Sequence, residues 1–183
     1  DGEENYCLYA GFPAAKLIKI ITAAAAIEKK GFTQTQTLPV AGRYHTLYRS
    51  QLGLGKGRYR SEQVPLDKAF ALSINPLFGK LGISYLSDAE FAQIAEGFLF
   101  NAPIDFDLAL PQSRIVQPLD DFERAEVASG YNTRTVISPL HAALIASLPA
   151  NDGKIMRPYI IDRIVAADGR ELYGKQIKVI SQP

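Results

Sequence analysis

Cysteine is nearly absent from this chain, which carries Cys7 as its single thiol in 183 residues. One cysteine excludes an internal disulfide and any metal site built from several cysteines. The sequence also lacks an apolar run long enough to cross a bilayer, and it shows no secretory signal peptide. No internal repeat is visible. We therefore expect a globular domain with no metal and no cofactor.

An excess of charge of either sign is also missing, because 20 Lys and Arg against 19 Asp and Glu leave a formal charge of +1. Such a balance excludes bulk attraction to nucleic acid, which is not an expected partner. The charge is nevertheless uneven. Residues 43–60 hold five basic side chains and no acid: Arg43, Arg49, Lys56, Arg58 and Arg60. With their tyrosines they could bind an anionic polymer, although their glycines also fit a surface loop.

Hydrophobic residues make up 47% of the chain, enough for the core of one domain spanning 1–183. The stretch FPAAKLIKIITAAAAIEKKG, residues 12–31, is apolar apart from two lysines and a threonine up to Ile27. It predicts a buried central helix from Pro13 to Lys30. Proline suits the first helical position, and Gly31 suits the left-handed residue that ends a helix.

Two lysines give this predicted helix a possible chemical role. Lys16 and Lys19 are three residues apart, so they share a helix face in the first turns, where the helix dipole disfavours cations. At about 6 Å and an effective dielectric of about 20, the two ammonium groups repel by roughly 3 kcal/mol. Such a breach of local rules is typical of functional sites. The alternative is that both amines extend to solvent.

A second candidate lies in the segment ALSINPLFGKLG. A helix is predicted over Leu66–Leu72, and Pro76 disfavours the α conformation at Asn75. Asn75 is therefore expected to cap a helix that runs to Leu81. Ser73 and Asn75 then lie in a tight connection with free side chains, although both could serve only as caps.

The remaining elements follow from caps, turns and apolar spacing. Helices are expected at Asp88–Phe98 after Ser87, within the acidic residues 118–129, and at Pro139–Leu148 after Ser138. Strands are expected at Arg157–Ala166 and Ile177–Ile180, with a hairpin turn at Asp168-Gly169. His45 and His141 are expected to have no chemical role.

Together these motifs resemble the transpeptidase domain of penicillin-binding proteins. FPAAKLIKIITAAAA is similar to the active-site helix of that family, which carries Ser-x-x-Lys, and ALSINPLFGKLG is similar to its Ser-x-Asn block. TVISPLHAALIASLPANDGKIMRPYIIDRIVAADGRELY is similar to the run that follows. The resemblance implies a mixed α/β (α+β) fold, with a helical region around a buried central helix beside a partial antiparallel sheet.

The departures from this family concern the chemistry. Lys16 stands where the family has its nucleophilic serine, and no serine of the chain has a lysine three residues after it. The resemblance gives Lys19, Ser73 and Asn75 the other catalytic places, and the Lys-Thr-Gly block is not found. An amine would form an amide instead of a labile ester. We therefore expect a D,D-transpeptidase-like domain that is catalytically inactive.

The partners implied by the resemblance are the peptidoglycan stem peptide or cell-wall assembly proteins, and a β-lactam as a possible ligand. Complete family members usually stand outside the cytoplasmic membrane behind an N-terminal anchor, so we expect a periplasmic or extracytoplasmic domain that is an interior portion of a longer protein. Two alternatives stay open. One is an enzyme that uses the Lys16 or Lys19 amine as nucleophile, and the other is an anionic-polymer binding module at 43–60.

Overall fold

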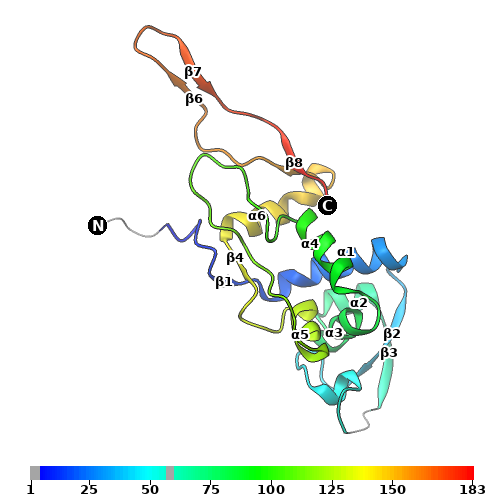
Figure 1. Ribbon diagram of the computed structural model, residues 1–183. Coiled ribbons are helices and arrows are strands. Elements are labelled where there is room, and N and C mark those ends of the chain that lie inside the picture. Colours follow the sequence, from blue (N-terminus) through cyan, green and yellow to red (C-terminus); the bar gives the residue numbers. More distant parts are fainter. Residues whose placement is uncertain (1–4, 57–59) are drawn as a thin grey trace. The chain divides into compact units, whose positions relative to one another are not determined.

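A computed structural model describes residues 5–56 and 60–183 of the chain, which form two compact units (Figure 1). One, the helical unit, comprises Pro13–Ala95 and Ile115–Val136. The other, the hairpin unit, comprises the residues up to Phe12 together with Glu96–Arg114 and Ile137–Pro183. The chain therefore alternates between the units instead of completing one before the other.

Helices and strands occur in both units. The α-helices are α1 (Ile18–Lys30), α2 (Leu66–Ala71), α3 (Asn75–Ser84), α4 (Asp88–Gly97), α5 (Asp121–Ser129) and α6 (Pro139–Ser147). Short 3-10 helices are η1 (Ala15–Leu17), η2 (Arg49–Leu52) and η3 (Leu148–Asn151). The strands are β1 (Phe12–Pro13), β2 (Thr37–Ala41), β3 (Ser61–Pro65), β4 (Val136–Ile137), β5 (Ile155–Met156), β6 (Arg163–Val165), β7 (Glu171–Gly174) and β8 (Val179–Ser181).

The central helix begins later than its sequence suggests. Pro13 is extended, and Ala15 takes a positive φ of 45°, so regular α-helix starts only at Ile18. The prediction that Pro13 opens the helix is therefore wrong, because the backbone turn at Ala15 interrupts the helical conformation. The other end is confirmed: Gly31 has φ 65° and donates its N–H to the Ile27 carbonyl.

One face of α1 helps to build the main core of the helical unit. This core joins α1, α2 and α3 to the antiparallel β2–β3 pair, in which Leu38 lies opposite Val64. Its buried members are Ala26, Leu38, Val40, Val64, Leu66, Ala69, Ile74, Leu77, Phe78 and Leu81. The expectation that α1 is buried on nearly all sides is too strong, because Ile27 is 50% exposed on an apolar groove that α1 shares with α2.

Helices α3 and α5 pack against each other through small residues. A Cβ on Gly82 would lie 2.5 Å from the Ala128 Cβ, and one on Gly79 would lie 3.2 Å from the Ala125 Cβ. Glycine at these positions lets the two helices approach closely. This close packing holds α5 against the middle and the C-terminal part of α3.

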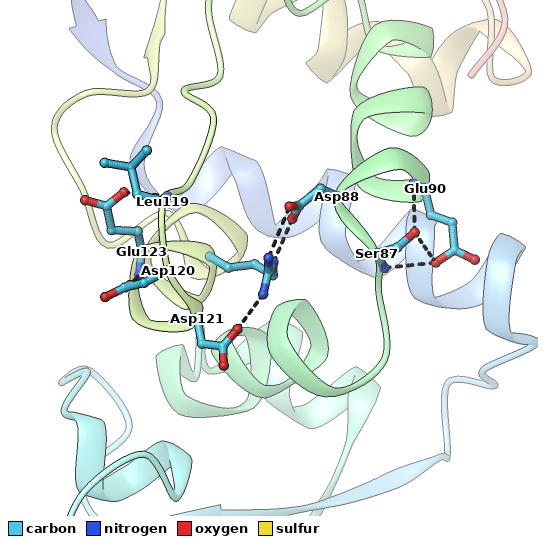
Figure 2. Close-up of polar contacts among 8 residues, drawn as sticks. Ser87, Asp88, Glu90, Leu119, Asp120, Asp121 and Glu123 are labelled. Atoms are coloured by element: carbon cyan, nitrogen blue, oxygen red, sulfur yellow. Dashed lines mark hydrogen bonds and ion pairs between the residues drawn. The ribbon is translucent and has the colours of Figure 1, made fainter.

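Helices α4 and α5 begin with the capping patterns that the sequence predicts. Figure 2 shows Ser87 and Glu90 in a reciprocal cap of α4, with the Ser87 N–H donating to the Glu90 carboxylate at 2.9 Å. Asp120 caps α5 by accepting the Glu123 N–H at 2.8 Å. Arg124 links the two helices, because its guanidinium donates to Asp88 and Asp121, each at 2.6 Å.

The hairpin unit contains α6 and two strand pairs. Ser138 caps α6 as predicted, and His141 has a structural role, with Nε2 2.7 Å from the Phe98 carbonyl oxygen. Antiparallel pairing joins β5 to β8 and β6 to β7, and Gly169 turns the β6–β7 hairpin with φ 84°.

The strand predicted over residues 157–166 is confirmed only at β6. The backbone before β6 forms hydrogen bonds to a side chain, that of Asp107, instead of to a neighbouring strand. The N–H groups of Ile160 and Ile161 donate to the Asp107 carboxylate at 2.8 and 2.9 Å. Arg157 donates to the same carboxylate at 2.9 Å. The mixed α/β fold class is confirmed, and within the described residues no helix is long and apolar enough to span a membrane.

Candidate active site

Lys19 is the most deeply buried charged side chain in the helical unit, with 2% of its surface exposed. Its amine donates to Asn75 Oδ1 at 2.8 Å and to the Ser129 carbonyl oxygen at 2.7 Å. The same nitrogen lies 5.7 Å from the centre of the Phe78 ring. No carboxylate among the described residues pairs with it. Lys19 is therefore a buried cation held by two neutral acceptors, one at the start of α3 and one at the C-terminal end of α5.

This environment changes the proton affinity of the amine. Burial, and to a smaller extent the nearby charge of Lys16, together lower the pKa of Lys19 from 10.5 to about 8. At pH 7 on the order of a tenth of the molecules then hold the neutral amine. A lysine of this kind can take up or release a proton under physiological conditions.

Asn75 holds its position through both its backbone and its side chain. Its N–H donates to the Tyr44 carbonyl at 2.7 Å, and its Oδ1 accepts from Lys19. The prediction that Asn75 is the N-cap is wrong by one residue, because Ile74 occupies the cap and makes no side-chain capping bond. The asparagine side chain binds the buried lysine instead of capping the helix.

Ser73 has a strained backbone next to this pair. Its φ of 54° lies in the left-handed region that non-glycine residues seldom adopt. Its Oγ is shielded from solvent and has no hydrogen-bond partner among the described residues. An unsatisfied hydroxyl on a strained backbone lowers stability, so its presence indicates a function other than packing.

Lys16 differs from Lys19 in its surroundings. It lies in η1 and is exposed, whereas Lys19 is buried in α1. The prediction that both lysines lie in the first turns of one α-helix is therefore wrong. The charge of Lys16 nevertheless still acts on Lys19. Gly130, with φ 69°, sits directly against this turn, because a Cβ there would overlap the Ala15 carbonyl.

The basic segment 43–60 is tied to the candidate site by its backbone, through the bond from Asn75 to Tyr44. One of its cations is already paired, since Arg49 donates to Asp120 at 2.9 Å and lies 4.9 Å from the Phe122 ring centre. Arg58, part of the predicted polymer-binding surface, lies outside the described residues. His45 is exposed.

The sequence pointed to the side chains of this site but not to its backbone acceptors. The carbonyls at the end of α5 hold α1 in place: Ser129 accepts from Lys19, and Ala128 accepts from the Thr22 hydroxyl at 2.6 Å. The dipeptide Ser129-Gly130 signals a helix end, but nothing local in the sequence says that this end meets α1. Among the described residues no group of three or more His, Cys, Asp or Glu is arranged to hold a metal ion.

The site thus contains an exposed amine, a buried amine bonded to an asparagine, and an unpaired serine hydroxyl. Lysine amines and serine hydroxyls are among the groups that acyl-transfer enzymes use. Residues 4–182 match the family model described as the penicillin binding protein transpeptidase domain. The chain belongs to this family.

Comparison with individual proteins agrees with this assignment. The chain is 29% identical over 170 residues to the peptidoglycan D,D-transpeptidase PbpA of Mycolicibacterium smegmatis, and 30% identical to PbpA of Mycobacterium tuberculosis. Each alignment covers 90% of this chain and 34% of the relative. The chain therefore spans about a third of the length of these curated relatives.

Solved structures of the family have the same fold. Penicillin-binding protein A of M. tuberculosis, as its imipenem acyl-enzyme complex, superposes with a TM-score of 0.77 at 26% identity, covering 98% of this chain and 41% of that one. The D,D-transpeptidase domain of a peptidoglycan glycosyltransferase from Eggerthella lenta gives a TM-score of 0.65 at 25% identity, covering 96% and 44%.

Proposed function

We propose that this chain is a transpeptidase-like domain of peptidoglycan metabolism that binds cell-wall components outside the cytoplasmic membrane without turning them over. The observation that carries the proposal is the amine of Lys16, which stands in the place that the family resemblance gives to the nucleophilic serine. Lys19, Ser73 and Asn75 take the remaining places of that resemblance. By this resemblance, the site retains Lys19, Ser73 and Asn75 and lacks only the nucleophilic serine hydroxyl, which Lys16 replaces.

The replacement changes the product of the first chemical step. A serine Oγ that attacks a carbonyl forms an ester and passes its proton to a base, and the ester is later cleaved by an amine or water. Attack by the Lys16 amine would form an amide, which resists both. Lys19 is engaged by Asn75 and Ser129, so it is not free to replace the missing nucleophile.

Binding of a carboxylate is the role that these groups support best. Lys16 is exposed and cationic, and it lies beside a buried cation, so both charges favour an anion. The D-Ala-D-Ala end of a stem peptide supplies such a carboxylate. The amine-nucleophile alternative is weaker, because Lys19, whose pKa is lowered, is buried and bonded to Asn75 and Ser129.

Acylation by a fluorescent penicillin, followed by intact-mass measurement, tests the inactivity. We expect no adduct on the native chain, none on Lys16→Ala, and a single adduct on Lys16→Ser, where the hydroxyl is restored. An adduct on the native chain would contradict the proposal. A Lys16→Ser variant that folds and stays unlabelled would show that Lys16 is not what prevents acylation.

Binding is tested separately with a peptide that ends in D-Ala-D-Ala. We expect the native chain to bind the free carboxylate form by calorimetry, and to bind its C-terminal amide at least about tenfold more weakly, which corresponds to about 1.4 kcal/mol. Lys16→Met should weaken binding by a similar factor. Lys29→Met, at the opposite end of α1, is the matched control and should have no effect. Equal binding of both peptide forms would reject the carboxylate role.

A further inference from the structure

The buried histidine of the hairpin unit has only one of its two ring nitrogens paired. His141 lies on α6 with 0% of its surface exposed. Its Nε2 lies 2.7 Å from the Phe98 carbonyl oxygen, whereas its Nδ1 has no hydrogen-bond partner among the described residues. A carbonyl oxygen can only accept, so Nε2 carries the hydrogen and Nδ1 holds a free lone pair. The ring is therefore the neutral tautomer protonated at Nε2.

No charge acts on His141 to compensate a second proton on its ring. Helix α6 has no other ionisable residue, and neither have η3 and β5, which contact it. Burial lowers the pKa of His141, and the hydrogen bond to Phe98 opposes this only in part. None of the ionisable residues that flank the neighbouring elements contributes to this shift: Cys7, Glu96, Arg114, Asp152, Lys154 and Arg157. A protonated His141 would thus be a buried cation with an unpaired N–H.

The carbonyl that His141 binds belongs to a strained turn. Leu99 and Asn101, which follow Phe98, have φ of 66° and 56°, in the region that non-glycine residues seldom adopt. Phe100 between them is buried, and its ring centroid lies 4.9 Å from that of the His141 ring. Backbone strain of this kind persists only where the surrounding structure holds it. The hydrogen bond from His141 is one of the contacts that hold it here.

The other end of the same segment is also tied to the start of α6. The Ser113 hydroxyl accepts the N–H of Ser138, the N-cap of α6, at 3.2 Å, and the Ser113 carbonyl accepts the Asn101 N–H at 2.9 Å. Ser138 Oγ in turn accepts the His141 N–H at 3.2 Å. Residues 98–113, here called the 98–113 segment, are therefore closed at both ends onto the first turn of α6. All of these contacts lie within the hairpin unit.

We propose that His141 is an acid-sensitive latch that holds the 98–113 segment against α6. Near neutral pH its Nε2–H donates to the Phe98 carbonyl, and the segment stays closed. In mild acid, a proton on Nδ1 can be solvated only if water reaches the ring, so the turn at Phe98 opens and its strain is released. This latch uses none of the residues invoked for the transpeptidase-like function.

The direction of the effect follows from the proton balance. The pKa of His141 is lowered in the closed state and returns toward 6.5 when the ring meets water. As the pH falls through 6.5, the opened state therefore binds a proton that the closed state does not take up. Opening becomes more favourable in acid, and the latch contributes its full stability only above this pH.

Hydrogen exchange of the whole ¹⁵N-labelled chain, followed by NMR between pH 7.5 and 5.5, tests the proposal. The readout is the protection factor of the Asn101 amide, which removes the intrinsic pH dependence of exchange. We expect this protection to fall at least about fivefold, because an opened imidazole with a pKa near 6.5 is mostly protonated at pH 5.5. The Ile74 amide, which donates to the Ala69 carbonyl at 2.9 Å in the helical unit, should keep its protection.

The two histidines of the chain provide a matched pair of variants. His141→Gln keeps a neutral N–H donor that cannot take up a proton, so the pH dependence at Asn101 should disappear. His45→Gln, which replaces an exposed histidine of the helical unit, should retain it. Should His141→Gln fail to fold, an NMR titration of the native ring decides, and we expect the neutral form to persist below pH 6.5. Constant protection of Asn101, a pH dependence that survives in His141→Gln, a parallel loss at Ile74, or a His141 ring that titrates at or above pH 6.5 would each overturn the proposal.

Discussion

At the scale of single residues, Lys16 and Lys19 differ in their surroundings. Lys19 is fixed in the interior by two neutral acceptors, and Lys16 is in contact with solvent. Both lysines stand out in the sequence, because two cations at a predicted helix start break the rule that cations avoid that end. The sequence could not show which of them is buried, because that depends on the turn at Ala15 and on the carbonyl of Ser129.

The first prediction concerns the pH dependence of stability. The pKa of Lys19 falls from 10.5 in the unfolded chain to about 8 in the folded one. Between these values the unfolded chain binds the extra proton, so stability rises with pH, by up to about 3 kcal/mol. Below pH 8 Lys19 is protonated in both the folded and the unfolded chain, so it no longer makes the stability depend on pH. Urea unfolding of native chain and Lys19→Met between pH 7 and 10.5 measures the effect, and parallel profiles for the two proteins would contradict it.

The second prediction concerns the strain at Ser73. Replacement by glycine removes both the penalty of a positive φ and the unsatisfied buried hydroxyl. Ser73→Gly should therefore raise the unfolding free energy by about 1 kcal/mol, after allowing for the greater freedom of glycine in the unfolded chain. Ser84→Gly, in the last turn of α3 with an exposed side chain, should instead lose roughly 0.5 kcal/mol. A loss at both positions in urea unfolding would refute strain at Ser73.

At the scale of secondary-structure elements, most helix positions could be predicted, because caps and prolines are local signals. Ser87, Asp120 and Ser138 each accept a backbone N–H at the start of a helix. The start of α1 could not be predicted, since Pro13 fits a helix locally but the contact between Gly130 and Ala15 requires a turn instead. Tertiary contact overrides the local preference there.

The third prediction uses two glycines that end helices in the same conformation. Gly31 after α1 and Gly130 after α5 have φ of 65° and 69°, but only Gly130 faces another backbone. Gly31→Ala should cost about 1 kcal/mol for the positive φ alone. Gly130→Ala should cost roughly 3 kcal/mol or more, because the added methyl also displaces the Ala15 carbonyl. Thermal and urea unfolding compare the two variants. Equal losses of unfolding free energy would show that the contact between Gly130 and the Ala15 carbonyl does not add to the cost of the substitution.

At the scale of the whole molecule, Asp107 links distant parts of the hairpin unit. It accepts from the Arg157 guanidinium, from the Ile160 and Ile161 N–H groups, and from the Tyr173 hydroxyl at 3.0 Å. These donors hold the pKa of the Asp107 carboxyl well below its usual range, with the backbone bonds having the largest effect. The residues lie far apart in sequence, so no periodicity indicates that they meet.

The fourth prediction follows from this carboxylate. Asp107→Asn keeps the shape but loses the charge, so amide hydrogen exchange at Ile160 and Ile161 should accelerate by at least about tenfold. Asp162→Asn, which affects only an exposed pair with Lys175, should leave those two amides unchanged. Residue-resolved exchange by NMR makes the comparison. Unaltered protection in Asp107→Asn would show that the segment is held by other contacts.

The alternation of the chain between its two units has a consequence for biosynthesis. Residues up to Phe12 are synthesised before Ile137–Pro183, with which they share a unit. The segment that carries Tyr6, Tyr9 and Phe12 therefore cannot contact Ile137–Pro183 until the residues of the helical unit between them have been translated. Chaperone demand should be highest in this interval, and no single cut in the polypeptide can release either unit intact.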